Sequence, residues 1–398
     1  MIKNRDIIIV GLQAWDIEIG SNCKNIAVEF AKHNRVLYVN APLDRISSLR
    51  HRKKASVQKR LQIIKGEKES IEKIQDNLWN FFPRKKIESI SRLKNNFLFD
   101  ILNKRNNTIF AKEIQYAIEK LDFKDFIIFN DSDMLRSFHL KELLKPQLYI
   151  YYTRDNLISM DYWKVQGARI EPIHMQKADL VVANSTYLSR LASQYNKNTF
   201  YVGQGCDISA FNPQKTKPIP KDIQTIPHPI IGYIGALLTV RLDIDIIIQI
   251  AQSKADWSIV LVGPEDEDFK NSILHQLPNV HFLGNKKGKE LPAYLNAFDV
   301  SINPQKLNPL TIGNYPRKID EYLAMGKITV ATKTEAMSVF KKHVYLAENK
   351  EDYVHLIEKG LQDNTAQKTE DRIRFAQEHT WENNVKAIYQ YIQATLSK

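Results

Sequence analysis

The feature that most constrains this chain is a regular alternation of short apolar runs, typical of β-strands, with stretches typical of helices. Strands that alternate with helices favour parallel sheets with right-handed crossovers. In the first half a helix is expected at 22–33. The strands expected there are 6–12, 36–40, 126–130, 148–152, 179–184 and 199–203. The pattern therefore predicts an α/β fold.

A cluster of prolines interrupts the alternation. Five of the fifteen prolines lie between Pro213 and Pro229, and prolines at this density prevent a continuous helix or a central strand. The alternation then restarts. The strands expected after the cluster are 230–237, 257–264, 280–284, 299–304 and 328–332, and the helices are 242–252, 317–325 and 381–397.

These two blocks predict two β/α/β domains with a cleft between them. We expect a first domain at 1–212 and a second domain at 230–380. The segment 213–229 is expected to be a linker that acts as a hinge. A C-terminal helix at 381–398 completes the predicted organisation.

Composition narrows the class of protein. Apolar residues make up 43% and charged residues 26% of the 398 residues, which is ordinary for a globular protein and excludes general disorder. Cys23 and Cys206 are too few for a disulfide framework and suggest a reducing compartment. No apolar run approaches the roughly 18 residues of a membrane-spanning helix, and the first apolar stretch is too short for a secretory signal. We expect a soluble, cytoplasmic, multidomain protein.

The net charge of +12 belongs to the first half of the chain. Residues 1–200 hold 34 Lys and Arg against 22 Asp and Glu, whereas residues 201–398 hold 23 of each. The densest basic segment, Arg45–Arg60, has seven basic residues and no acid, and a second basic stretch runs over 84–105. This charge fits a solvated surface, a surface for anionic lipid headgroups at about 1 kcal/mol per cation, or nucleic-acid binding. No recognisable nucleic-acid module accompanies it.

Glycines and polar residues follow several expected strands, where ligands of open α/β sheets bind. The loop 11–22 contains Gly11 and Gly20 and leads into a helix, whose N-terminus favours an anion. Its spacing fits neither a dinucleotide fingerprint nor a P-loop, so an ordinary connection is the alternative. Beyond Gly235, Arg241 can clamp a diphosphate, or it can pair with neighbouring aspartates on the surface.

A further candidate is the helix start after Pro316, which suits a first helical position. Arg317 and Lys318 in that first turn oppose the helix dipole, so a negative partner is expected. An anionic ligand is one such partner. Glu321 lies on the same face one turn on and can accept from paired hydroxyls such as those of a ribose. The alternative is a local ion pair between Lys318 and Glu321.

Metal-binding and nucleophilic patterns are weak. The sequence Asp131-Ser-Asp133 follows a strand and can hold a divalent cation, but an N-cap for a helix at 134–144 explains it as well. The histidines and cysteines show no metal-ligand spacing, and we expect no metal site. Cys23, within an amphipathic helix, is expected in the core.

Taken in order, these motifs resemble a known enzyme family. The second half is similar to the nucleotide-sugar domain of GT-B fold glycosyltransferases, especially the large retaining family 4, also called group 1. The runs that carry the likeness are Tyr233–Gly235, Arg241–Asp243, WSIVLVGP, NVHFLG, ELPAYLNAFDVSINP and YPRKIDEYLAMGKITVAT.

The first half resembles a subgroup of bacterial cell-envelope polysaccharide enzymes, such as teichuronic acid biosynthesis glycosyltransferases. The matching runs are Trp15-Asp16, Gly20–Asn22, VLYVNAPLDR, YYTRDNL and ADLVVANSTYL followed by GQGCDISAF. The resemblance implies two Rossmann-like domains that face a central cleft, with the C-terminal helix packed back toward the first domain.

The resemblance also implies roles for individual residues. Arg241 and Lys318 would hold the donor diphosphate, with Gly235 and Arg317 beside them. Gly20 would approach it from the other domain.

Two acidic positions follow from the same likeness. Glu321 matches the second glutamate of the family's E-x7-E motif, which binds the donor ribose, whereas the first position falls on Gly313 and has no carboxylate. Asp155, within YYTRDNL, matches a polar position near the transferred sugar.

The implied activity is metal-independent transfer of a sugar, with retention, from a UDP- or GDP-sugar to a lipid-linked or growing cell-surface polysaccharide. No further cofactor and no nucleic acid are expected, and the basic segment would face an anionic membrane at the inner face of the cell membrane. Three alternatives remain: a sugar-nucleotide epimerase or phosphorylase of similar fold, a non-catalytic lipid- or nucleic-acid-binding protein, and a metal-dependent transferase that uses Asp131–Asp133.

Overall fold

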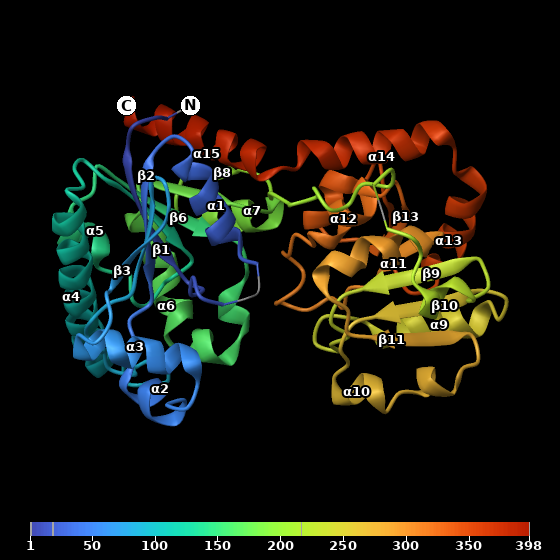
Figure 1. The fold of residues 1–398 in the computed structure, drawn as a ribbon, viewed down its shortest axis with the longest axis horizontal. Helices are drawn as coiled ribbons and strands as arrows, with labels where there is room; N and C mark the ends of the chain where they lie inside the picture. The colour runs from blue at the N-terminus through green and yellow to red at the C-terminus, as the bar shows by residue number, and fades with distance from the viewer. Residues whose placement is uncertain (1, 18–19, 216, 398) are drawn as a thin grey trace. The chain divides into compact units, whose positions relative to one another are not determined.

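The chain folds into two compact units in the computed structural model, which describes residues 2–17, 20–215 and 217–397. Unit 1 comprises the chain up to Gly203 and returns from Trp381 onward, and unit 2 comprises Gln204–Thr380. Each unit is an α/β domain built on its own sheet, as the alternation predicts (Figure 1).

The sheet of unit 1 is parallel except at one edge. Its strand order is β3-β4-β2-β1-β5-β6-β7-β8, and only β3 runs antiparallel to its neighbour β4 in this part of the described chain. The strands are β1 (Asp6–Gly11), β2 (Arg35–Asn40), β3 (Ile71–Gln75), β4 (Leu78–Phe81), β5 (Ile127–Asp131), β6 (Leu148–Thr153), β7 (Leu180–Ala183) and β8 (Thr199–Tyr201). The residues of β1, β5 and β6 are all buried, which explains why these strands read as continuous apolar runs.

Helices cover both faces of this sheet. They are α1 (Asn22–Ala31), α2 (Arg45–Arg50), α3 (Ala55–Lys65), α4 (Asn96–Leu121), α5 (Leu140–Leu144), α6 (Asp161–Lys177), α7 (Thr186–Ser193) and α15 (Trp381–Leu396). The side chains of α15 join those of α1 in one core, where the rings of Phe30 and Tyr389 lie 5.3 Å apart. The prediction that the C-terminal helix packs onto the first domain is therefore confirmed.

Unit 2 has a six-stranded sheet in the order β11-β10-β9-β12-β13-β14, in which every neighbouring pair is parallel. The strands are β9 (Ile230–Ile234), β10 (Ser258–Val262), β11 (Val280–Gly284), β12 (Val300–Asn303), β13 (Ile328–Thr332) and β14 (Tyr345–Ala347). The helices are α8 (Lys221–Gln224), α9 (Ile244–Ser253), α10 (Glu267–Lys270), α11 (Leu291–Ala297), α12 (Lys318–Ala324), α13 (Asp352–Asp363) and α14 (Ala366–Glu378). Because strand order reverses beside β9, the switch point where such sheets bind ligands lies at the carboxyl end of β9.

The predicted linker at 213–229 is wrong, because most of this segment packs on unit 2. Ile223 and Ile226 are buried in the core of unit 2. Asp222 accepts hydrogen bonds from Lys286 at 2.6 Å and Tyr294 at 2.9 Å. The prolines limit regular structure here to the short helix α8, but they do not prevent the apolar side chains between them from packing. The chain crosses between the units after Gly203 instead of after 212, so the expected hinge is misplaced.

Helix α6 and strand β6 enclose a polar cluster inside unit 1. The hydroxyl of Tyr151 donates to Oε1 of Glu171 over 2.8 Å, and Nε2 of His174 lies 2.9 Å from the hydroxyl of Tyr149. Burial raises the pKa of Glu171 to about 7, although the hydrogen bond from Tyr151 opposes this shift. Burial also lowers the pKa of His174 to about 3. Glu171 therefore titrates near neutral pH inside the fold.

Ionisation of Glu171 is expected to destabilise unit 1 as the pH rises. Its folded-state pKa lies above its ordinary value, so its contribution is fully present below about pH 4.5 and is lost as the pH rises through 7. The lost stability is of the order of 1–3 kcal/mol. Glu171→Gln keeps an acceptor for Tyr151 and removes the charge. In thermal unfolding, the stability of the variant relative to the wild type should rise between pH 5 and pH 8.5. A difference in unfolding temperature that stays constant over this range would contradict the prediction.

Candidate functional site

Two glycines bring the loops after β9 and β10 into backbone contact. A Cβ on Gly263 would lie 1.9 Å from the carbonyl oxygen of Gly235. Both glycines have positive φ angles, 143° for Gly235 and 154° for Gly263, which L side chains rarely adopt. The amide of Gly235 donates to the carbonyl of Val262 over 2.9 Å. The switch-point edge of unit 2 is therefore a tight, preformed turn.

The ammonium group of Lys318 occupies the space that Gly235 leaves open. A Cβ on Gly235 would lie 2.8 Å from Nζ of Lys318. Nζ lies 3.9 Å from the ring centroid of Tyr233 and donates a hydrogen bond to its hydroxyl. One turn further along α12, the hydroxyl of Tyr322 accepts from the amide of Ile234 over 3.1 Å. A positive charge is thus held beyond the end of β9 against the ring of Tyr233, while Tyr322 ties α12 to the end of the strand.

Acidic and basic side chains share the first turn of α12. Arg317 immediately precedes Lys318, and Glu321 follows one turn on. Burial raises the pKa of the Glu321 carboxyl, although Arg317 and Lys318 lower it. Among the described residues neither Lys318 nor Glu321 takes part in an ion pair, so the local pair considered from the sequence does not form. The structure therefore places Lys318 against Gly235, with Glu321 one turn further along α12, and their binding of a donor stays a prediction.

Asp320 anchors the same helix from inside the core. Its Oδ1 lies 2.7 Å from Nδ1 of His379 and accepts from the hydroxyl of Tyr315 over 3.2 Å. Burial raises the pKa of Asp320 against the lowering effect of His379. The carbonyl of His379 also accepts from the amide of Cys206 over 2.8 Å. The sequence analysis missed this anchor, because His379 is 59 positions away and no local pattern links the two.

Arg241 lies on an exposed turn of the loop that follows β9. Its carbonyl accepts from the amide of Lys306 over 2.9 Å, and Asn308 donates to the carbonyl of Val240 over 2.8 Å. The turn is thus tied to the loop after β12, the other strand of the switch point. That loop also contains Gly313, which is buried. Arg241 and Gly235 therefore share one loop, as the sequence predicts.

In unit 1 both aspartates of the sequence Asp131-Ser-Asp133 form ion pairs with arginines. Oδ1 of Asp131 lies 2.8 Å from Nε of Arg154, whose Nη1 lies 3.1 Å from Asp155. Burial lowers the pKa of Arg154, but Asp131 and Asp155 raise it above its ordinary value. Asp133 accepts from the amide of Arg136 over 3.0 Å and pairs with its side chain.

Asp133 thus caps a turn and not the start of the helix that the capping interpretation expects. The helix predicted at 134–144 is wrong over most of its length, because α5 spans only Leu140–Leu144. The described residues contain no group of three or more His, Cys, Asp or Glu that could hold a metal ion. Cys23 is fully buried in the core, as predicted.

Gly20, the second predicted residue in unit 1, is exposed just before α1. A Cβ there would meet nothing within 4 Å, and Ser21 begins the helix without a side-chain cap. Glu18 and Ile19, in the same predicted loop, lie outside the described residues. The approach of Gly20 to a ligand stays a prediction.

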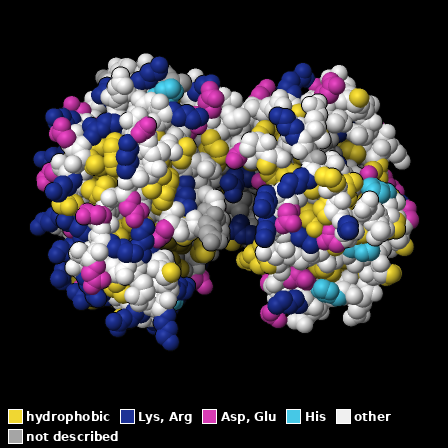
Figure 2. Space-filling view, viewed as in Figure 1, with side chains coloured by type: hydrophobic (Ala, Val, Ile, Leu, Met, Phe, Trp, Pro, Cys, Tyr) yellow, Lys and Arg dark blue, Asp and Glu magenta, His cyan; other side chains and the backbone are white. Residues whose placement is uncertain are grey.

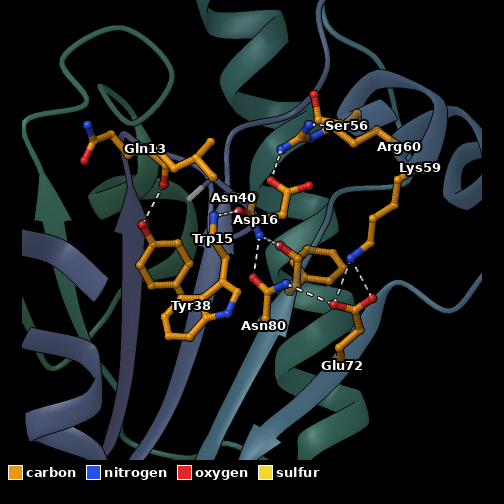
Figure 3. A network of polar contacts seen from close by, with 12 residues as sticks. Gln13, Trp15, Asp16, Tyr38, Asn40, Ser56, Lys59, Arg60, Glu72 and Asn80 are labelled. Atoms are coloured by element: carbon orange, nitrogen blue, oxygen red, sulfur yellow. Dashed lines mark hydrogen bonds and ion pairs between the residues drawn. The ribbon is translucent and has the colours of Figure 1, made fainter. Parts of the chain in front are cut away.

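A polar network links the loop after β1 to α3, as Figure 3 shows. The amide of Trp15 donates to Asn40 over 2.8 Å, and Asn40 donates to Asn80 over 2.7 Å. Lys59 pairs with Glu72 at 2.9 Å.

The neighbouring Arg60 of α3 pairs with Asp16 at 3.0 Å (Figure 3). Two cations of the segment Arg45–Arg60 are therefore neutralised inside unit 1, and Arg45 pairs with Glu88 at 2.9 Å.

Comparison with known proteins finds a family whose members resemble most of unit 2. The family of glycosyl transferases group 1 matches residues 228–363, which span the strands and loops described above. Unit 2 contains a group 1 glycosyltransferase domain. This domain supplies Gly235, Arg241, Arg317, Lys318 and Glu321.

A curated relative extends the likeness. TuaH of Bacillus subtilis (strain 168), which bears the name of a teichuronic acid biosynthesis glycosyltransferase, is 31% identical over 200 residues. The match covers 48% of this chain and 50% of TuaH, so the chain aligns with half the length of that relative.

Solved structures match the whole chain. Sucrose-phosphate synthase from Thermosynechococcus elongatus aligns with a TM-score of 0.67 and 14% identity, over 99% of this chain and 100% of that one. A trehalose-phosphate synthase from Burkholderia vietnamiensis gives 0.68 and 11% over 99% and 100%. Anabaena HepE in complex with UDP and glucose gives 0.61 and 14% over 98% and 100%. At these identities the matches show the fold alone. The two units together therefore have the GT-B fold.

The close approach at the switch point predicts a ranking of glycine substitutions. Gly263→Ala should destabilise the glycosyltransferase domain most, because its Cβ meets backbone 1.9 Å away. Gly235→Ala should cost about 1–3 kcal/mol, because strained backbone adds to displacement of the Lys318 ammonium. Gly288→Ala is the control, since its Cβ meets nothing within 4 Å. Urea unfolding measures all three, and equal midpoints would contradict the ranking.

Proposed function

We propose that the protein transfers a sugar from a nucleoside-diphosphate sugar to a lipid-linked or growing cell-surface polysaccharide. The observation that carries this proposal is the Lys318 ammonium held against Tyr233 at the switch point of a group 1 glycosyltransferase domain. Sugar transfer separates an oxocarbenium-like sugar from a diphosphate that gains negative charge. A preorganised cation at that place stabilises such a leaving group.

Each predicted residue takes one role in this proposal. Lys318, Arg241 and Arg317 bind the diphosphate, and Gly235 lets it approach the backbone. Glu321 accepts hydrogen bonds from the ribose hydroxyls, for which its acceptor oxygens are suited. From unit 1, Gly20 approaches the diphosphate and Asp155 lies near the sugar.

The donor is proposed to be a UDP- or GDP-sugar, with no other cofactor. Support for a nucleotide comes from solved structures of the same fold, since HepE is named in complex with UDP and with UDP-glucose. Support for a polysaccharide acceptor comes from the name of TuaH. Transfer is proposed to be metal-independent and retaining. Asp131 and Asp133 support metal independence, because both carboxylates are already paired with arginines.

We further propose that the protein works at the inner face of the cell membrane, with the exposed part of Arg45–Arg60 against anionic lipid. Arg52, Lys53 and Lys54 are exposed and take part in no ion pair among the described residues. Leu49 is 74% exposed beside them. Cations next to an exposed apolar side chain are suited to an anionic membrane surface. Figure 2 shows many Lys and Arg side chains over unit 1, including its lower end, where Figure 1 places α2 and α3. Among described residues no helix is long and apolar enough to span a membrane.

Nucleotide binding is the first test. One of UDP, GDP, ADP, dTDP and CMP should raise the unfolding temperature, because a ligand at about 100 times its Kd adds about 2.7 kcal/mol of stability. Lys318→Met and Glu321→Ala should each reduce this shift. Lys289→Met, an exposed lysine of the same domain, is the matched control. Shifts that survive both site substitutions would place the nucleotide elsewhere, and no shift with any nucleotide would favour a non-catalytic protein.

Vesicle flotation tests the membrane surface. The protein should float with vesicles rich in phosphatidylglycerol and stay behind with phosphatidylcholine. Replacing Arg52, Lys53 and Lys54 by Gln should weaken binding to the anionic vesicles roughly a hundredfold, since each cation contributes about 1 kcal/mol at such a surface. Lys341→Gln with Lys342→Gln removes exposed charge from unit 2 as a control. Equal binding to both vesicle types would refute the membrane surface.

A further inference from the structure

Unit 1 contains a groove between α2, the segment 87–92 and the start of α6. Its volume is about 270 Å³, just below the range of about 300–1,000 Å³ that is usual for small-molecule sites. None of the residues assigned above to donor binding lines it. The groove is therefore a separate feature of unit 1.

The wall of the groove is held rigidly by buried polar contacts. The amides of Arg45 and Ile87 each bond to the opposite segment over 3.1 Å. Asn106 of α4 accepts from the amide of Glu88 and donates to its carbonyl, both over 2.9 Å. Asp44 accepts from the amide of Ser47 over 2.9 Å and from the hydroxyl of Ser89. The groove is therefore preformed.

The acidic side chains of the lining, Asp44 and Glu88, already have hydrogen-bond or ion-pair partners. Burial raises the pKa of Asp44, but its hydrogen bonds from Ser47 and Ser89 bring it below its ordinary value. Glu88 is paired with Arg45 at 2.9 Å. These carboxylates stay charged or paired without a ligand, so they do not require a cation in the groove.

Two arginines of the lining remain available. Arg50 and Arg92 line the groove from its two walls. Both are exposed, and neither takes part in an ion pair among the described residues. Guanidinium groups bind phosphate through paired, charge-assisted hydrogen bonds. The polar side of the groove is thus suited to a phosphate.

Apolar and aromatic side chains line the same groove. Ile46 and Tyr162 stand at the lining with 47% of their surface exposed. The rings of Tyr162 and Trp163 lie 5.1 Å apart at right angles. Exposed apolar side chains beside a polar pocket mark a surface that an apolar group covers.

We propose that this groove binds the phosphate of an alkyl or polyprenyl phosphate, with Arg50 and Arg92 on the phosphate and Ile46, Tyr162 and Trp163 on the chain. The assignment rests on the proposed function, because it makes the groove the place that holds the lipid end of the acceptor. The combination of two arginines with apolar and aromatic side chains in one lining selects this class over free phosphate or a neutral sugar.

Calorimetric titration of the full chain tests the groove directly. The probes are n-decyl phosphate below its micellar concentration, inorganic phosphate, and n-decyl maltoside. Decyl phosphate should bind at least about tenfold more tightly than either of the others, because only it engages both the arginines and the apolar side chains of the lining. Arg50→Gln with Arg92→Gln should weaken its binding at least about tenfold.

Lys68→Gln with Lys112→Gln removes the same charge from exposed positions of unit 1 outside the groove, and should change the affinity less than twofold. Thermal unfolding verifies that both double variants fold. Decyl maltoside binding as tightly as decyl phosphate, or equal losses in the two double variants, would overturn the proposal. The nucleotide-induced shift is measured on the same samples, so a wild-type protein that shows the nucleotide-induced shift but does not bind decyl phosphate refutes only the groove.

Discussion

The site of unit 2 depends on the lack of a side chain at Gly235 and at Gly263. Gly263 allows the loop after β10 to contact the carbonyl of Gly235, and Gly235 in turn leaves room for the ammonium of Lys318. Any larger residue at these positions would separate the loops or displace the charge. The parallel sheet beneath supplies the rigid edge on which this contact is built. The position of the cation is thus set by backbone geometry more than by ion pairing.

The first turn of α12 combines groups that would be unfavourable alone. Lys318 and Arg317 oppose the positive end of the helix dipole, and Glu321 is partly buried with no ion pair to any described residue. Tyr233 stabilises the ammonium through its ring, and Asp320 fixes the helix start through His379. A helix start tied down at these points holds its exposed charges in place before a ligand arrives, which is the condition for electrostatic stabilisation.

Unit 1 separates its charge into paired and unpaired parts. Lys59 pairs with Glu72 on the edge strand β3 and Arg60 pairs with Asp16 in the loop after β1, whereas Arg50 and Arg52 stay exposed. The segment Arg45–Arg60, which is uniformly basic in sequence, therefore divides into two parts with different roles. One part stabilises the fold, and the other remains available for an anionic surface or a phosphate.

Much of the fold follows from local pattern, but much of the site does not. The strands β1 and β10 and the helix α15 were predictable because burial on parallel sheets demands continuous or periodic apolar residues. Helix α4 was not predicted, since its Asn-rich first half weakens the apolar periodicity. Gly235, Lys318 and Glu321 were predictable from a strand end and a helix start. Tyr233 and His379 were not, because their partners lie 85 and 59 positions away.

The sequence by itself determined the α/β class, the two sheets, the glycine turns at strand ends and the excess charge of the first half. These depend on residue type and on neighbours within one turn or strand. Only the tertiary structure decided that the proline-rich segment packs on unit 2, which cations are neutralised, and that a groove opens beside Arg50. Burial and ion pairing depend on distances between segments far apart in the chain, and a local pattern does not encode those distances.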